Sequence, residues 1–439
     1  MKLETICPAV WDHLCVNTTG KNRLCCNAKT QDNDKLIKNF DNHWNEFRNG
    51  VKEEMLKGNK PEVCAQCWKK EDLGLKSLRK TFIDRYQRNN LWEDYLYRID
   101  KDVKNLPTEL DLKLGNFCNL SCRMCNGQSS SKYLTELKKI VKDKNWKNIQ
   151  DWPEDSPLTG LVQGDELDLN VTDWYDSPKF EKLLYKFIDN GLKLIKFTGG
   201  EPLMVPNAKK IIEYCIAKDK AKDLELMIIT NMTLLNDEWL QLFSYFKHVS
   251  MNMSIDGVGK TYEYIRHPSS WETVYENLKT FSNFKNTAIF KKIVTEGDRN
   301  FTFTSTSIDK TGKDRFMIPN ITFTFSVLNI LEVDQIVYLR RELGFLLNII
   351  PVLEPAYLDV KYAPESLKKE AISRCKKLLN DIKLEDEKIF IENCITKISE
   401  NVDESEAKVM QKRVIAISQL KDGYRGQSFF GQTISRYYV

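Results

Sequence analysis

The sequence lacks any run of eighteen apolar residues, which is about the length that a membrane-spanning helix needs. Its opening residues, 1–5, also lack the apolar core of a secretory signal peptide. The formal net charge is only +4 over 439 residues, so the overall electrostatics do not favour a nucleic-acid partner. We therefore expect a cytoplasmic protein whose partners include neither a membrane nor a nucleic acid.

Histidine is also scarce, with four residues in the chain, whereas cysteine is plentiful, with twelve. Cytosolic proteins seldom use cysteine for disulfides, so this number indicates metal or redox chemistry. Nine of the cysteines precede residue 126. The other three, Cys215, Cys375 and Cys394, lie singly in helical patterns and are expected to be small buried apolar residues.

Three cysteines are spaced C-x3-C-x2-C at Cys118, Cys122 and Cys125. Residues 110–114 alternate apolar and polar side chains, which predicts a strand that ends just before this loop. Three thiolates are one short of the four that close a [4Fe–4S] cluster, and a metal with an open position can bind a further ligand. Zinc and disulfides are the alternatives, but no histidine follows closely and disulfides would leave one thiol unpaired.

A second motif supports the open cluster. Residues 193–197 predict a strand, and Thr198-Gly199-Gly200-Glu201-Pro202 follows it. Together the two motifs resemble the radical S-adenosylmethionine (radical SAM) superfamily. The resemblance implies that Cys118, Cys122 and Cys125 are the catalytic cluster ligands and that SAM binds the open iron. It also implies that Gly199, Gly200 and Glu201 meet the methionine end of SAM, because glycines leave backbone groups accessible.

The same resemblance extends to polar residues near later strand ends. It implies that SAM is also bound by Asn231, Ser254, Asp256 and Arg266. Hydroxyl and carboxylate groups suit the ribose, and a guanidinium suits a carboxylate. The alternative is an Asp256 that caps a turn and an Arg266 on the surface.

The N-terminal region carries a looser pattern, Cys7-x12-Gly20-x4-Cys25 followed by Cys64-x2-Cys67. It resembles the SPASM auxiliary-cluster domain, whose shortened form is called a twitch domain. The resemblance implies an auxiliary [4Fe–4S] cluster on these four cysteines. A structural zinc site is the alternative, and Cys15 and Cys26 are close enough in sequence to compete as ligands.

Strands and helices alternate after residue 108, which predicts an α/β fold with a parallel sheet. The predicted strands are 109–115, 193–198, 224–230, 249–255, 321–327 and 347–352. The resemblance implies that these six strands form a partial (β/α)6 barrel. The predicted domains are 1–100, a Cys-rich α+β twitch-like domain with a β-hairpin; 101–360, the barrel; and 361–439, a helical extension with an aromatic tail.

The function implied by the resemblance is reductive cleavage of SAM to a 5′-deoxyadenosyl radical, which abstracts hydrogen from a substrate. A flavodoxin or ferredoxin would supply the electron. We favour a peptide or protein substrate, because the insertions predicted from the sequence would frame a broad cleft. Oxidation of a small carbohydrate-like molecule is the second possibility. A non-catalytic zinc-binding interaction module is the alternative from another class.

Overall fold

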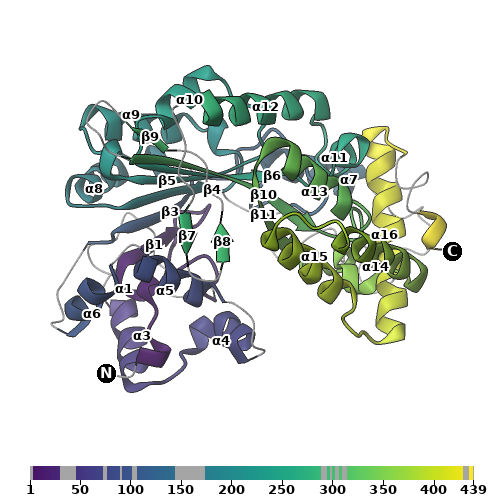
Figure 1. Ribbon diagram of the computed structural model, residues 1–439, viewed down its shortest axis with the longest axis horizontal. Coiled ribbons are helices and arrows are strands. Elements are labelled where there is room, and N and C mark those ends of the chain that lie inside the picture. The colour runs from purple at the N-terminus through teal and green to yellow at the C-terminus, as the bar shows by residue number, and fades with distance from the viewer. Residues whose placement is uncertain are drawn as a thin grey trace. The chain divides into compact units, whose positions relative to one another are not determined.

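The computed structural model describes most of the chain (Figure 1). The described residues are 3–29, 46–72, 77–88, 91–100, 106–143, 174–287, 294–296, 299–301, 306–308, 314–428 and 435–438. They divide into two compact units. The first unit comprises residues 1–115, 170–199 and 205–227, and the second comprises 116–169, 200–204 and 228–439. The predicted domain boundaries stay a prediction, and most of the predicted insertion at 145–176 lies outside the described residues.

The strands of the first unit are mainly parallel. They are β1 (His13–Val16), β2 (Asn22–Arg23), β3 (Glu109–Lys113) and β4 (Leu194–Thr198). β1 and β2 form the predicted antiparallel hairpin, while β1 also pairs in parallel with β3, and β3 with β4. The hairpin is therefore an extension of the sheet that carries β3, an arrangement that the sequence did not predict.

The helices of the first unit are α1 (Pro8–Asp12), α3 (Glu46–Lys57), α4 (Ala65–Asp72), α5 (Leu78–Arg88), α6 (Trp92–Asp100), α8 (Pro178–Asp189) and α9 (Pro206–Ala217). Apolar side chains of α1, α3, α4, α5 and α6 form one buried cluster, which includes Met55, Trp68 and Tyr95. Buried Asp12 receives two hydrogen bonds of 2.9 Å from Arg98, so its charge is paired within the unit.

The second unit contains the parallel strands β6 (His248–Ser254), β10 (Asp314–Phe325) and β11 (Leu346–Pro351) in the order β11-β10-β6. Its helices are α7 (Ser131–Asp143), α10 (Asp237–Phe243), α11 (Gly259–Ile265), α12 (Trp271–Thr287), α13 (Val333–Leu343), α14 (Glu365–Leu379), α15 (Glu385–Ile398) and α16 (Glu404–Arg425). Strand β5 (Glu225–Thr230) crosses the boundary between the units. The predicted mixed α/β fold with parallel strands and a helical C-terminal region is confirmed.

Smaller antiparallel elements accompany β10. Strand β9 (Thr306–Ile308) pairs with β10, and β7 (Val294–Glu296) pairs with β8 (Arg299–Phe301). Among the described residues, none of the helices is both long and apolar enough to cross a membrane.

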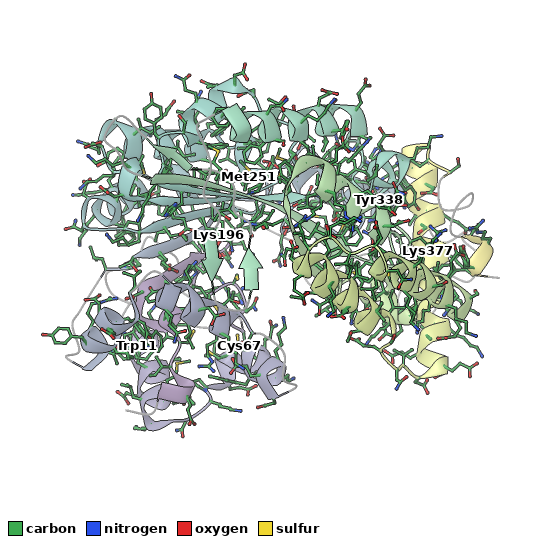
Figure 2. The ribbon with its side chains drawn as sticks, viewed as in Figure 1. Trp11, Cys67, Lys196, Met251, Tyr338 and Lys377 are labelled. Atoms are coloured by element: carbon green, nitrogen blue, oxygen red, sulfur yellow. The ribbon has the colours of Figure 1, made fainter. Side chains whose placement is uncertain are left out.

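The two faces of the β6-β10-β11 sheet differ in chemistry. Alternate residues such as Met251, labelled in Figure 2, and Phe323 are fully buried and apolar. On the opposite face, Ser254, Thr322 and Asn348 occupy one register across the three strands. The hydroxyl of Thr322 is buried without a hydrogen-bond partner in the described part of the chain. This face therefore presents neutral hydrogen-bonding groups rather than an apolar core.

Candidate functional site: two groups of cysteines

The segment that carries the cysteine triplet, residues 116–127, is named the cysteine loop here. Its backbone is fixed by hydrogen bonds to the chain just after α11. The amide of Ser121 donates to the carbonyl of His267 at 2.7 Å, and the amide of Arg123 donates to that of Ile265 at 2.9 Å. The Asn116 side-chain amide closes the loop by donating to the Gly127 carbonyl at 2.7 Å. The loop is thus held in one conformation by groups other than the thiols.

The three predicted cluster ligands lie together in this loop. Cys122 is buried, and Cys118 and Cys125 are partly buried. Burial raises the pKa of all three thiols, to about 12 for Cys118, and the neighbouring thiols add to the shift for Cys118 and Cys125. Without a metal these groups stay protonated. A bound metal would deprotonate them, since thiolates are the form that coordinates.

The two glycines of the second motif are required by close backbone contacts. A Cβ atom on Gly200 would lie 2.1 Å from the carbonyl oxygen of Phe117, inside the cysteine loop. Gly199 has a φ of +113°, and its Cβ would lie 2.7 Å from the Gly115 carbonyl oxygen. The structure therefore adds a reason for Gly200 that the sequence did not suggest, which is contact with the loop itself.

The carboxylate of Glu201 is buried and serves as a hydrogen-bond acceptor for nearby protein groups. It accepts from the Thr230 hydroxyl at 2.8 Å, the Asn231 amide at 2.7 Å and the Leu203 amide at 3.1 Å. Burial raises its pKa to about 7, and these donors oppose the shift. Its predicted contact with SAM stays a prediction, and the structure gives it a supporting role for the end of β5.

Asn231, at the end of β5, reaches the cysteine loop. Its side-chain amide donates to Asn119 at 2.9 Å, and Asn119 in turn donates to the Thr233 hydroxyl at 2.8 Å. The Thr233 hydroxyl donates back to Asn231 at 2.6 Å, which closes a ring of three side chains. Asn119 lies between Cys118 and Cys122 in the sequence, so this ring orients the first half of the triplet.

Asp256 and Arg266, which were both predicted to bind SAM, form a buried ion pair with 2.6 Å between Arg266 Nη2 and Asp256 Oδ2. Burial raises the pKa of Asp256 against the opposing effect of Arg266. Arg266 Nη1 lies 3.8 Å from the Cys122 sulfur, while its Nε has no partner among the described residues. A cation with an unused donor thus stands beside the triplet. Ser254 lies on the polar face of β6, half-buried.

The last turns of α16 also contact the cysteine loop, which sequence reasoning missed. Arg123 donates to the Asp422 carboxylate, and its guanidinium lies 3.6 Å from the ring centroid of Tyr264. Arg425 donates to the carbonyl of Ser121 at 2.6 Å and to Glu136 at 2.8 Å. No sequence signal links positions about 300 residues apart.

The four N-terminal cysteines predicted as ligands line one cavity in the first unit. They are Cys7, Cys25, Cys64 and Cys67, the last of which is labelled on α4 in Figure 2. Burial raises the pKa of Cys25 and Cys64 to about 12 and that of Cys7 well above its usual value, with neighbouring thiols adding to each shift. Three separate segments of the chain therefore bring thiols to a common space.

Two buried arginines hold these segments in place. Arg48 donates to the carbonyls of Ala9 at 3.1 Å and Val10 at 3.0 Å, just after Cys7. Arg79, which itself lines the cavity, donates to the Ile6 carbonyl at 2.9 Å and pairs with Glu71. Arg79 therefore places a cation in the cavity wall, where it opposes the upward shift that burial gives to the pKa of Cys64.

The two competing cysteines are not among the residues that line this cavity. Cys15 is buried on β1 in register with Asp111, and its pKa is raised first by burial and then by Asp111 and Cys26. Gly20, the glycine of the pattern, has a φ of +78°, and a Cβ there would lie 2.7 Å from the Trp174 ring. The glycine is thus explained by backbone conformation and packing.

The ligand chemistry of both the cysteine loop and the N-terminal cavity fits an iron–sulfur cluster. Each offers only thiols as ligands, and the second unit offers three, which leaves one position open. Among the described residues, no three Cys, His, Asp or Glu side chains converge as a site for a single metal ion. A four-iron cluster is a larger body with its ligands spread around it. The unused Arg266 donor beside Cys122 is a polar group available to such a centre.

Residues 112–290 match the Radical SAM superfamily. This range holds the triplet, the glycine motif and the polar residues described above. The family implies a [4Fe–4S] cluster and SAM as its cofactors.

Two curated proteins of Bacillus subtilis (strain 168) are similar to parts of the chain. The antilisterial bacteriocin subtilosin biosynthesis protein AlbA is 33% identical over 81 residues, which is 18% of this chain and 17% of AlbA. The sporulation killing factor maturation protein SkfB is 24% identical over 161 residues, which is 37% of this chain and 29% of SkfB. The matches thus cover less than a third of either relative.

Solved structures of Streptococcus suis SuiB are also similar to this chain. The structure bound to S-adenosylmethionine has a TM-score of 0.34 at 13% identity, covering 70% of this chain and 52% of SuiB. The structure bound to the precursor peptide SuiA has a TM-score of 0.33 at 12% identity, covering 76% and 52%.

Proposed function

We propose that the protein is a radical SAM enzyme that modifies a peptide or protein. The observation that carries the proposal is the cysteine loop, which presents three thiols within the residues that match the Radical SAM superfamily. Cys118, Cys122 and Cys125 would hold a [4Fe–4S] cluster with SAM on its open iron. Once reduced by a flavodoxin or ferredoxin, the bound cluster would supply the electron that cleaves SAM to methionine and a 5′-deoxyadenosyl radical.

The surrounding residues would hold the cysteine loop in place and orient the bound cofactor. Asn119, through its ring with Asn231 and Thr233, and Glu201, through its three donors, fix the positions of the loop and the β5 end. Arg266 would place its unused Nε donor beside the cofactor, with Asp256 holding the guanidinium in place. The backbone around Gly199 and Gly200 would remain accessible to the methionine end of SAM. These contacts limit the freedom of a reactive radical.

The peptide substrate is supported by two observations. The partial relatives are named for bacteriocin biosynthesis and for maturation of a killing factor. In addition, the polar face of β6, β10 and β11 offers neutral groups, among them Ser254, Thr322 and Asn348. Neutral donors and acceptors suit the amide groups of a peptide backbone, whereas a phosphorylated or strongly acidic substrate calls for arginine or lysine there.

The four N-terminal cysteines would hold an auxiliary [4Fe–4S] cluster. The proposal is supported by their shared cavity and by the exclusion of Cys15 and Cys26 from its lining. Such a cluster would accept an electron from a substrate radical or stabilise the first unit. Zinc on the same cysteines is the competing outcome, and iron, sulfide and zinc analysis of the purified protein distinguishes the two.

The test is anaerobic reconstitution with iron and sulfide, followed by dithionite and SAM. The expected result is a [4Fe–4S] signal and release of 5′-deoxyadenosine. Deuterium transfer from labelled candidate peptides into 5′-deoxyadenosine then tests the substrate class, with labelled small sugars as the comparison. A colourless zinc protein that leaves SAM intact would overturn the proposal in favour of a binding module.

A further inference from the structure

One buried cation near the cysteine loop has no role in the site described so far. Lys421 lies in the last turns of α16 and is only 2% exposed. Its Nζ lies 4.3 Å from the ring centroid of Tyr133 on α7 and has no hydrogen-bond partner among the described residues. A buried ammonium without an acceptor is costly, so its position calls for a negative partner.

The neighbours of Lys421 show which part of the molecule it faces. Asp422, the next residue, accepts from Arg123, and Arg425, one turn later, donates to Ser121. Both of these partners belong to the cysteine loop. The same helix end therefore contacts the loop on either side of Cys122, and Lys421 is buried at this contact.

The charges around Lys421 are of both signs. Burial lowers its pKa to about 7, and Arg425 and Arg123 lower it further, whereas Glu136 and Cys125 oppose the shift. Glu136 is already paired with Arg425. The Cys125 thiol also opposes the downward shift in the pKa of Lys421, and as a cluster ligand it would carry negative charge. A bound cluster would thus supply negative charge close to the buried ammonium of Lys421.

We propose that Lys421 is a positioning residue for the reduction step, whose ammonium stabilises the reduced cluster held by the cysteine loop. This inference rests on the proposed function. Reduction adds one electron to the cluster, and a nearby buried cation favours the more negative state. Lys421 would therefore raise the reduction potential and ease electron transfer from the donor to the cluster. It would act without contacting SAM or substrate.

The test is a potentiometric titration of the reconstituted full-length protein, followed by electron paramagnetic resonance. The cluster in the cysteine loop is distinguished from an auxiliary cluster because its signal changes when SAM is added. Lys421→Met removes the charge and keeps the length of the side chain. We expect the ratio of reduced to oxidised cluster at a fixed potential to fall roughly tenfold, which is about 59 mV for a one-electron couple.

Two controls accompany this variant. Lys408→Met removes an exposed lysine from the same helix, where Lys408 pairs only with Glu404 in solvent, and should leave the potential unchanged. Lys421→Arg keeps the charge and should restore most of the potential. If Lys421→Met does not retain iron, Lys421→Gln replaces it.

Two results would overturn the inference. The first is a Lys421→Met protein with full iron content whose potential equals that of the unmodified protein. The second is an equal shift in Lys408→Met, which would show that the effect is not local. If the unmodified protein has no cluster that responds to SAM, the proposed function itself fails, and the inference fails with it.

Discussion

The two groups of cysteines are assembled in opposite ways. Those of the second unit, Cys118, Cys122 and Cys125, lie within eight consecutive residues of the cysteine loop, and hydrogen bonds from distant residues hold that loop. Those of the first unit come from separate segments, and Cys7 and Cys64 are 57 positions apart in the sequence. A short motif can be recognised in a sequence because its spacing is local. A site gathered from several segments depends on the fold around it.

The largest expected effect comes from removing one ligand of each group. Cys122→Ser should lower the iron content of the reconstituted protein from about eight to about four atoms per chain and reduce 5′-deoxyadenosine to background. Cys7→Ser should lose the other four atoms, while reductive cleavage of SAM stays measurable. Iron analysis and product chromatography report both results.

Cys394→Ser is the matched control, because Cys394 is a buried cysteine of α15 that belongs to neither group of predicted ligands. It should keep its full iron content. If Cys7→Ser abolished both clusters, the two groups would form a single cooperative site, and the contrast between them would be wrong.

Glycine substitutions test how each group is supported by packing. Gly200→Ala places a Cβ 2.1 Å from the Phe117 carbonyl oxygen, and we expect a loss of about 3 kcal/mol or more in unfolding free energy. Gly20→Ala meets the Trp174 ring at 2.7 Å with a positive φ and should cost about 2 kcal/mol. Denaturant titration measures both values.

Gly423→Ala, on α16, has no atom within 4 Å of the new Cβ and should be neutral or stabilising by up to about 1 kcal/mol. The two destabilised variants should lose iron from different sites. Gly200→Ala should lose it from the cysteine loop, and Gly20→Ala should lose it from the N-terminal cavity. Loss from both sites in either variant would contradict independent support.

After the cysteine and glycine substitutions, the smallest expected effect is the loss of stability of the second unit in acid. Burial and Lys247 lower the pKa of His248 on β6 to about 4, from an ordinary value of 6.5. The stability that depends on neutral His248 is fully present above pH 6.5 and is lost as the pH falls toward 4. The loss should reach about 2 kcal/mol at pH 5.

The first unit should not share this response. Burial tends to raise the pKa of Asp111 on β3, but Lys196 and His13 hold it below its usual value, so its contribution is lost only below about pH 4. Hydrogen exchange of the backbone amides of β6 and β3 at pH 7 and pH 5 distinguishes the acid responses of the two strands. His248→Gln should reduce the loss in β6, and equal acid sensitivity of both strands would contradict this account.

The sequence predicted what local patterns encode. The alternation in residues 110–114 and the spacing of the cysteines were sufficient to place β3 and the loop after it. Helix α8 has Ser177 at its N-cap position and Pro178 in its first turn, but the Ser177 side chain makes no capping hydrogen bond. A propensity names a suitable residue type and does not determine its rotamer.

The remaining features depend on contacts between distant residues. The pairing of β1 with β3 joins positions almost 100 apart, and the contact of Arg123 with Asp422 joins positions almost 300 apart. Such contacts leave no periodic signal in a single sequence. The sequence likewise did not predict that Arg266 and Asp256, both predicted to bind SAM, form an ion pair with each other.

The bonds from Arg425 and Asp422 to the cysteine loop have a consequence for biosynthesis. A ribosome makes the triplet about 300 residues before it makes the helix end that holds it. A nascent chain therefore exposes these thiols unsupported for most of translation. Iron delivered early would meet a cysteine loop that α16 does not yet hold in place. Chains truncated before α16 would never form these contacts.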